Sequence, residues 1–263
     1  MEPFNLSGQG VVVTGAGGGI GAALARRFAA AGARVVVNDL DADAAQAVAA
    51  EIGGTAVPGD AAGHAGVEHL VAEARRALGG IDLYCANAGI AASGSPAAAV
   101  EDDWARSWEV NVMAHVRAAE ALLPEWLERG RGHFLPTVSA AGLLTALGAA
   151  PYSVSKHAAL AYAEWLSATY RHRGVTVQAL CPQGVRTRML KDSGAVGSLL
   201  LAGDAIEPED VADAVVEALG DGRFLILPHP EVADYYAARA TEPDRWLRGM
   251  NKLQRLVEDL DEG

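Results

Sequence analysis

The fold of this chain follows from residues 11–21, which read VVVTGAGGGIG, from Val11 to Gly21. A short run of valines is typical of a strand buried on both faces. The glycine-rich turn after it opens a helix expected over 19–31. A dinucleotide pyrophosphate requires a tight turn, backbone without Cβ atoms and a helix N-terminus, which Gly15, Gly19 and Gly21 can supply. The spacing is not the familiar Gly-x-Gly-x-x-Gly, so a flexible glycine-rich loop is the alternative.

The same strand-to-helix alternation continues along the chain. Such alternation predicts an α/β fold, a Rossmann-type doubly wound parallel sheet with helices on both faces, in one domain over 1–263. An apolar loop is expected at about 188–206, and a C-terminal extension at about 229–263. We expect about seven strands, at 11–13, 34–38, 55–58, 81–86, 133–138, 175–181 and 224–227, and helices at 19–31, 41–52, 64–78, 102–128, 152–173 and from Pro208.

Composition narrows the class of protein. The chain has 263 residues, of which 51% are hydrophobic and 21% charged, with a net charge of −12. Such an acidic chain repels nucleic acid and anionic membrane surfaces, and we expect neither as a partner. Cys85 and Cys181 lie in apolar runs and are expected to be buried thiols. No signal peptide or membrane-length apolar run is visible, which predicts a cytoplasmic protein.

Two aspartates follow predicted strands at positions suited to an adenosine moiety. Asp39 ends the second strand, where a carboxylate accepts hydrogen bonds from ribose hydroxyls and repels a 2′-phosphate. Asn38 precedes it, and no basic residue lies in the glycine turn, so the predicted cofactor is NAD(H), not NADP(H). A cap for the next helix is the alternative for Asp39. Asp60 is predicted to reach the adenine amine, with an exposed turn residue as its alternative.

A second motif, Tyr152-Ser153-Val154-Ser155-Lys156, falls inside a helical pattern. Residues four apart share one face of a helix, so Tyr152 and Lys156 are expected side by side. The ammonium is expected to lower the pKa of the phenol, which can then exchange a proton with a substrate near neutral pH. A coincidental helical pair is the alternative.

Taken together, these motifs resemble the short-chain dehydrogenase/reductase family over nearly all of residues 7–228. Thr14-Gly15-x-x-x-Gly19-x-Gly21 resembles the cofactor turn of that family, and Asn87-Ala88-Gly89 its Asn-Ala-Gly motif. The residues that match its catalytic tetrad are Asn111, Ser139, Tyr152 and Lys156, and those that match the segment packed on the nicotinamide are Pro182, Val185 and Thr187.

The resemblance implies hydride transfer between the nicotinamide cofactor and a secondary alcohol or ketone. It implies that Tyr152 acts as general base or acid. Lys156 would lower the pKa of this phenol and hold the nicotinamide ribose, and Ser139 would hydrogen-bond the reacting oxygen. Asn111 resembles the family residue that holds a water molecule in the proton relay. The alternative is an asparagine that is simply buried and hydrogen-bonded. The expected cofactor contacts are Gly15, Gly18, Gly19, Ile20, Asp39, Leu40, Asp60, Ala61, Asn87, Ala88, Gly89, Tyr152, Lys156, Pro182, Val185 and Thr187.

Three residues depart from the family pattern. Ala86 replaces an asparagine, and Gln183 replaces a glycine beside the nicotinamide, where its amide could meet the substrate. Pro136 lies inside a predicted central strand and is expected to cause a local irregularity just before Ser139. Substrate contacts are therefore expected from Ser139, Gln183 and Leu143.

Apolar residues near the predicted site favour a lipid-like, steroid-like or aromatic alcohol, although they could simply pack the loop. These are Leu143, Leu144, Leu147, Met189, Leu190, Leu199, Leu200 and Leu201. The resemblance implies a homo-oligomer, dimer or tetramer, and Trp104, Trp108, Trp126 and Trp165 are expected in core or subunit packing. No metal-ligand pattern is present. The alternatives in function are an NADPH-dependent carbonyl reductase and a catalytically idle dinucleotide sensor.

Overall fold

The computed structural model describes residues 4–91, 100–193, 201 and 203–261. A six-stranded parallel sheet has the order β3-β2-β1-β4-β5-β6, and a further parallel pair is formed by β7 and β8. The strands are β1 (Gly10–Val13), β2 (Arg34–Val37), β3 (Thr55–Ala56), β4 (Leu83–Ala86), β5 (Gly132–Pro136), β6 (Val175–Val177), β7 (Ala179–Leu180) and β8 (Leu225–Ile226). The predicted doubly wound α/β fold is confirmed.

The predicted sixth strand is divided at Gln178 into β6 and β7. The Gln178 side chain donates to the carbonyls of Ala218 and Arg223, and its backbone N–H donates to Phe134. A bridge between Thr137 and Leu180 carries the pairing onward. The seventh strand, β8, therefore pairs with the second half of a divided strand.

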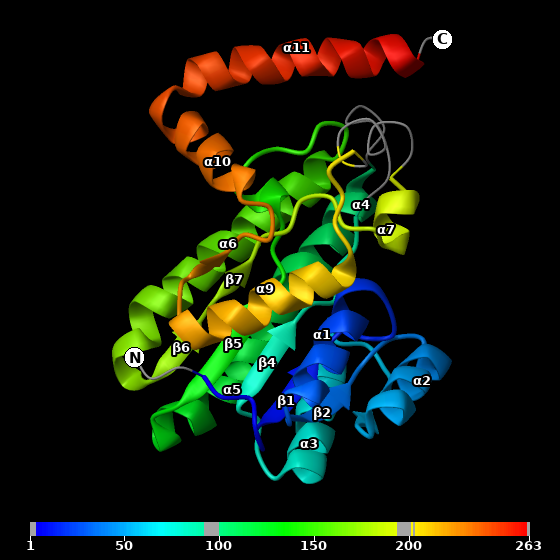
Figure 1. The fold of residues 1–263 in the computed structure, drawn as a ribbon, viewed down its shortest axis with the longest axis vertical. Coiled ribbons are helices and arrows are strands. Elements are labelled where there is room, and N and C mark those ends of the chain that lie inside the picture. The colour runs from blue at the N-terminus through cyan, green and yellow to red at the C-terminus, as the bar shows by residue number, and fades with distance from the viewer. Residues whose placement is uncertain (1–3, 92–99, 194–200, 202, 262–263) are drawn as a thin grey trace.

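Helices cover both faces of the sheet (Figure 1). Alternate strand residues feed two cores. Val12 and Phe134 pack with α3, α5 and α6, whereas Val11 and Leu135 pack with α1, α2 and α9. The α-helices are α1 (Gly19–Ala30), α2 (Ala42–Ile52), α3 (His64–Leu78), α4 (Glu101–Trp108), α5 (Ala114–Arg129), α6 (Ala150–Tyr170), α7 (Arg188–Lys191), α9 (Pro208–Asp221), α10 (Glu231–Thr241) and α11 (Pro243–Asp261).

The long helix predicted over 102–128 is interrupted by a π-helical segment, Glu109–Met113, between α4 and α5. Short π segments inside α-helices are frequently found at functional sites, and this one contains Asn111. The described residues contain two 3₁₀ turns, at Ala140–Gly142 and Arg171–Arg173. The apolar loop expected at about 188–206 begins with α7; 194–200 and 202, which include Leu199 and Leu200, lie outside the described residues.

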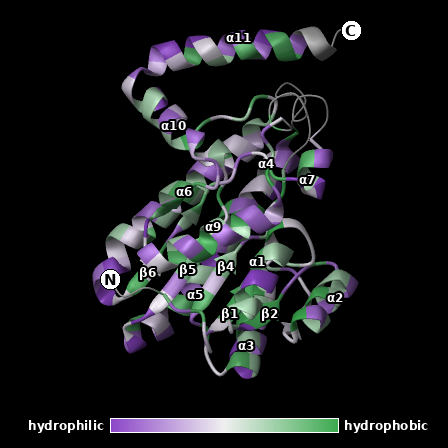
Figure 2. Ribbon diagram, in the orientation of Figure 1, coloured by the Kyte–Doolittle hydropathy of each residue, from purple (hydrophilic) through white to green (hydrophobic). Residues whose placement is uncertain are grey.

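Hydrophobic residues concentrate in the strands, whereas the outer helices carry mixed faces (Figure 2). None of the helices in the described ranges is both long and apolar enough to cross a membrane. The strand order reverses at β1, which has β2 on one side and β4 on the other. In such sheets ligands bind at the carboxyl ends of the strands beside this reversal, and the predicted site residues follow β1, β2, β4 and β5.

Candidate functional site

The glycine turn after β1 is shaped by close backbone contacts. Gly15 and Gly19 have φ angles of +61° and +53°, in the left-handed region that favours glycine. A Cβ at Gly15 would lie 2.9 Å from the Cα of Ala88, and one at Gly19 would lie 3.1 Å from Cγ2 of Thr187. A Cβ at Gly18 would meet nothing within 4 Å. The turn thus lies against Ala88 and Thr187 and keeps its Gly18 side open.

Thr14 links the ends of β1 and β4 beneath this turn. Its Oγ1 accepts hydrogen bonds from the backbone N–H groups of Asn87 and Ala88, at 3.0 and 2.9 Å. The Asn87 amide donates to the carbonyl of Thr14 and accepts from the hydroxyl of Thr137. The Asn87 side chain therefore braces three strand ends. The sequence does not reveal these roles of Thr14 and Thr137, because both residues bond to Asn87, which lies far from each of them along the chain.

The carboxylate of Asp39 lies at the glycine turn. Its Oδ2 accepts from the N–H of Gly17 at 2.9 Å, and its Oδ1 accepts from the N–H of Asp41 at 3.0 Å. Asp41 itself caps α2, accepting from the N–H groups of residues 43 and 44. The alternative role of Asp39, as the cap of this helix, is thus filled by Asp41. Leu40, between them, is exposed.

Asp60 lies in the turn that precedes α3. Its two carboxylate oxygens accept from the N–H groups of Ala62 and Gly63, both at 2.9 Å. This geometry matches the alternative of a turn aspartate, and contact with an adenine stays a prediction. The side chain of Ala61 is packed into the core, so only its backbone is available to a ligand.

The ammonium of Lys156 is buried at the carboxyl ends of β4 and β5. It donates to the carbonyl oxygen of Thr137 at 2.9 Å and lies 5.6 Å from the ring centroid of Tyr152. Burial lowers the pKa of Lys156 to about 8. A Cβ at Gly89 would lie 3.3 Å from this nitrogen and 3.2 Å from Oδ1 of Asn111. Gly89 therefore permits the close approach of two predicted catalytic residues.

The expected depression of the tyrosine pKa by Lys156 is wrong for the geometry seen here. Burial raises the pKa of the half-buried Tyr152, and a hydrogen bond with Ser139 partly opposes this rise. The ammonium lies 5.6 Å from the ring centroid of Tyr152, and burial disfavours its own charge.

Ser139 has a φ of +144°, the one positive φ outside glycine in the described ranges. Such backbone conformations persist where the surrounding structure holds them, and they cluster at functional sites. Its Oγ accepts from the N–H of Ala141 at 3.1 Å and lies 3.5 Å from the carbonyl of Pro182. Pro136 closes β5 in regular pairing with Ala86, so the irregularity expected before Ser139 occurs at Ser139 itself.

Asn111 is fully buried in the π-helical segment. Its Nδ2 donates to the carbonyl of Ile90 and to Oγ of Ser155, and its Oδ1 accepts from the N–H of Ile90. Both amide hydrogens are used, which matches the alternative of a buried, bonded asparagine. The side chain fixes the segment after Gly89, and a relay water held through it stays a prediction.

His229, which sequence analysis did not single out, holds the segment after Pro182. Its Nδ1 accepts from the N–H of Gln183 at 3.2 Å, so Nε2 donates to the carbonyl of Gly184 at 3.0 Å. Both nitrogens of this buried ring thus fix the turn where Gln183 replaces a glycine. The Oε1 atom of Gln183 is buried without a hydrogen-bond partner in the described structure.

The prediction that Leu143 contacts the substrate is wrong, because its side chain is fully buried in the core. Apolar residues that line a pocket and those that fill a core look alike in a sequence. Val185 is buried in a bridge to Ile206, and Thr187 reaches the glycine turn.

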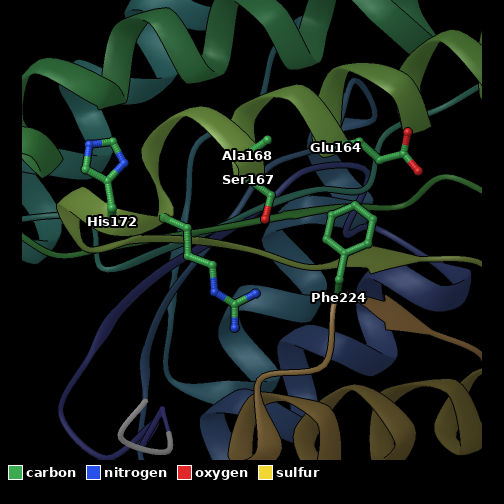
Figure 3. Close-up of a pocket in the computed structure, with 6 residues that line it drawn as sticks. Glu164, Ser167, Ala168, His172 and Phe224 are labelled. Carbon is green, nitrogen blue, oxygen red and sulfur yellow. The ribbon is translucent and has the colours of Figure 1, made fainter.

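A surface hollow at the far end of α6 lies apart from these residues (Figure 3). It contains none of the predicted site residues and is lined by Glu164, Ser167, Ala168, Arg171, His172 and Phe224. The candidate site is therefore the convergence at the strand ends.

Comparison with known proteins agrees with this geometry. Residues 9–196 match the family model described as short chain dehydrogenase. The chain belongs to the short-chain dehydrogenase family.

Named relatives and a solved structure support the assignment. The chain is 42% identical to 1-deoxy-11-beta-hydroxypentalenate dehydrogenase of Streptomyces exfoliatus, covering 87% of this chain and 86% of that protein. It is 35% identical to 2,5-dichloro-2,5-cyclohexadiene-1,4-diol dehydrogenase of Sphingobium indicum, covering 84% and 94%. A short-chain dehydrogenase from Burkholderia phymatum, solved with NAD, superposes with a TM-score of 0.85 at 28% identity, covering 92% and 96%.

This short-chain dehydrogenase is an oxidoreductase with a nicotinamide dinucleotide cofactor, and its residues fit that group. The turn at Gly15 and Gly19 has left-handed φ angles that favour glycine, and the Asp39 carboxylate lies beside it. In the described part of the chain, no group of three His, Cys, Asp or Glu residues is placed to hold a metal ion.

Proposed function

We propose that the protein transfers hydride between NAD(H) and a secondary alcohol or ketone carried on an apolar ring system. The observation that carries the proposal is the convergence of Ser139, Tyr152 and Lys156 beside the glycine turn. Ser139 and Tyr152 share a hydrogen bond, and Lys156 lies beside the Tyr152 ring. The bound nicotinamide supplies the hydride acceptor or donor.

The roles of the side chains follow from their chemistry. In alcohol oxidation, the Tyr152 phenolate takes the hydroxyl proton while the hydride leaves the carbinol carbon; in ketone reduction, the phenol returns the proton. The Ser139 hydroxyl holds the reacting oxygen. Lys156 is assigned to hold the nicotinamide ribose, and the hydrogen bond with Ser139 offsets part of the rise that burial imposes on the pKa of Tyr152.

The preference for NAD over NADP rests on Asp39. Its carboxylate is fixed at the turn by the N–H of Gly17, where it repels an added 2′-phosphate. The rival, an NADPH-dependent carbonyl reductase, predicts tighter binding of NADP. Thermal shifts with NAD and NADP in parallel separate the two.

The substrate class is supported by the relatives and by the residues around the site. Both named relatives act, by their names, on hydroxyl groups of carbocyclic compounds. Met189 is exposed, and Leu144, Leu190 and Leu201 are partly exposed near the segments that follow Ser139 and Thr187. A panel of alicyclic secondary alcohols with NAD, followed by the absorbance of reduced nicotinamide, tests this class. Binding of NAD without turnover of any alcohol or ketone would favour the idle dinucleotide sensor.

A homo-oligomer is supported by exposed apolar side chains on α4 and α6. Trp104 and Trp108 of α4, and Val154 and Trp165 of α6, are 40–54% exposed, whereas Trp126 is in the core. Large exposed aromatic side chains on neighbouring helices are typical of protein interfaces. Trp165→Glu is expected to shift the mass measured by light scattering towards the monomer. Cytoplasmic localisation stays a prediction.

A further inference from the structure

The C-terminal arm, defined here as α10 and α11, is attached to the catalytic region. Figure 1 shows α10 leading away from the sheet into α11, which runs across one end of the molecule. Val232 of α10 is fully buried, and Tyr236, one turn later, packs against the same core as α6. Arg239 follows on this face at helical spacing. The arm therefore presents Arg239 to the body of the enzyme.

Arg239 forms two hydrogen bonds with segments more than 80 residues away. Its Nη1 donates to the carbonyl oxygen of Leu143 and to Nε2 of His157, the latter at 2.9 Å. His157 Nδ1 lies 2.8 Å from the carbonyl of Ser153, so Nδ1 carries the proton and Nε2 is the acceptor. The two contacts of His157 are thus mutually consistent with one neutral tautomer.

Both partners of Arg239 are directly connected to the reacting groups. Leu143 follows the 3₁₀ turn that Ser139 caps, and a Cβ at Gly142 in that turn would lie 2.7 Å from the carbonyl oxygen of Lys156. Ser153 follows Tyr152, and its hydroxyl bonds the backbone N–H and carbonyl of Ala146. The segment 139–146 is therefore held by α6 on one side and by Arg239 on another.

Pairing with an acidic side chain does not explain the position of Arg239. The protein has 33 acidic residues, yet Arg239 has no carboxylate partner within the described ranges. The neighbouring Arg245 behaves differently, since it pairs with Glu242 on the surface. The guanidinium of Arg239 instead lies over the ring of Trp246, 5.4 Å from its centroid, which attaches α11 to the same point. Its polar contacts are a backbone carbonyl and an imidazole, which suits a positioning role.

We propose that Arg239 is a positioning residue that docks the C-terminal arm onto segment 139–146, so that the arm forms one wall of the substrate site. The inference rests on the proposed function. A wall of this kind matters for a large ring substrate, which extends beyond the reacting carbon, and little for a small alcohol that fits between Ser139 and Tyr152. Arg239 thereby acts on substrate size, through Leu143 and His157, without touching the reacting atoms.

The test compares Arg239→Ala, Arg239→Lys and the matched control Arg245→Ala. Each variant is assayed with a fused-ring alcohol and with 2-propanol, and its dissociation constant for NAD is measured. Hydrogen exchange of 140–149 and 231–241 is recorded in parallel.

For Arg239→Ala, kcat/KM for the ring alcohol is expected to fall about tenfold to a hundredfold, mainly through KM, as for loss of a hydrogen bond to a charged group. With 2-propanol, kcat/KM should change less than about twofold, NAD binding should be retained, and both segments should exchange faster. Arg239→Lys should recover part of the loss, and Arg245→Ala should match the wild type.

Unchanged exchange, or an equal loss with both alcohols, would overturn the positioning role. Absence of turnover by the wild type with any alcohol would instead contradict the proposed function, because the exchange measurement reports the docking of the arm without catalysis.

Discussion

The ammonium of Lys156 donates to the carbonyl oxygen of Thr137, 2.9 Å away, at the end of β5. This bond places a buried charge between the strand that leads to Ser139 and the helix that carries Tyr152. The same strand end braces Asn87 through the hydroxyl of Thr137. Thr137 thus connects Asn87, beside the glycine turn, with Lys156.

Lys156→Met is expected to abolish turnover without destabilising the fold. The pKa of Lys156 is lowered from 10.5 to about 8, so below pH 8 its buried charge costs about 3 kcal/mol, and stability rises as pH increases from 8 to 10.5. Loss of the bond to Thr137 offsets about 1–3 kcal/mol of the gain. Denaturant unfolding at pH 7 should show stability equal to or above that of the wild type, without the rise between pH 8 and 10.5. A marked loss of stability would show that the charge supports the fold.

Asp39→Ala is expected to weaken the preference for NAD over NADP by about tenfold to a hundredfold, the range for loss of a charge-assisted hydrogen bond. The matched control is Asp41→Ala, two residues away, which removes the cap of α2. That control should cost about 1 kcal/mol of stability and leave the cofactor preference unchanged. Titration of both cofactors by thermal shift measures the two effects. An equal change of preference in both variants would remove Asp39 from cofactor selection.

We expect the folded state to lose stability in acid because two histidines are buried. Burial lowers the pKa of His133 to about 4 and that of His115 to about 3, well below the ordinary 6.5. Their neutral forms are kept in the folded state, so the stability they contribute is present above pH 6.5 and is lost as pH falls through the range down to these values. Between pH 6.5 and 4 each histidine contributes a slope of about 1.4 kcal/mol per pH unit.

His133→Phe, which keeps a ring against Phe4, should remove one of these two slopes. Urea unfolding at several pH values measures the slope independently of any change in absolute stability. An unchanged slope in the variant would mean that His133 binds its proton in the folded state near the ordinary pKa.

Much of the fold was predictable because local signals and global fold agree. The valine runs and the glycine turn identified the parallel sheet, and the strand order brings the residues after β1, β4 and β5 together. The division at Gln178 was not predictable, since it depends on carbonyls 40 and 45 residues away. The π-helical segment at Asn111 likewise contacts Ile90, a partner that no local pattern reveals.

The residues of the candidate site were selected from motif spacing and family resemblance, and their catalytic roles stay predictions. The structure places Lys156 beside Tyr152, yet the direction of the tyrosine pKa shift depended on burial, which a sequence does not show. His229 and Arg239 were missed because each acts on backbone atoms of distant residues, and such contacts require no particular residue type at the other end.

The central claim is most directly tested by following a labelled hydride. Wild-type protein and Tyr152→Phe are incubated with NAD and an alicyclic secondary alcohol deuterated at its carbinol carbon, and the reduced cofactor is analysed by mass spectrometry. The wild type should yield deuterated NADH, whereas Tyr152→Phe should bind NAD with nearly unchanged affinity and yield none. Label transfer at near-normal rate in the variant would remove Tyr152 from the mechanism. Failure of the wild type to transfer label, with NAD bound, would contradict the assignment as an alcohol dehydrogenase.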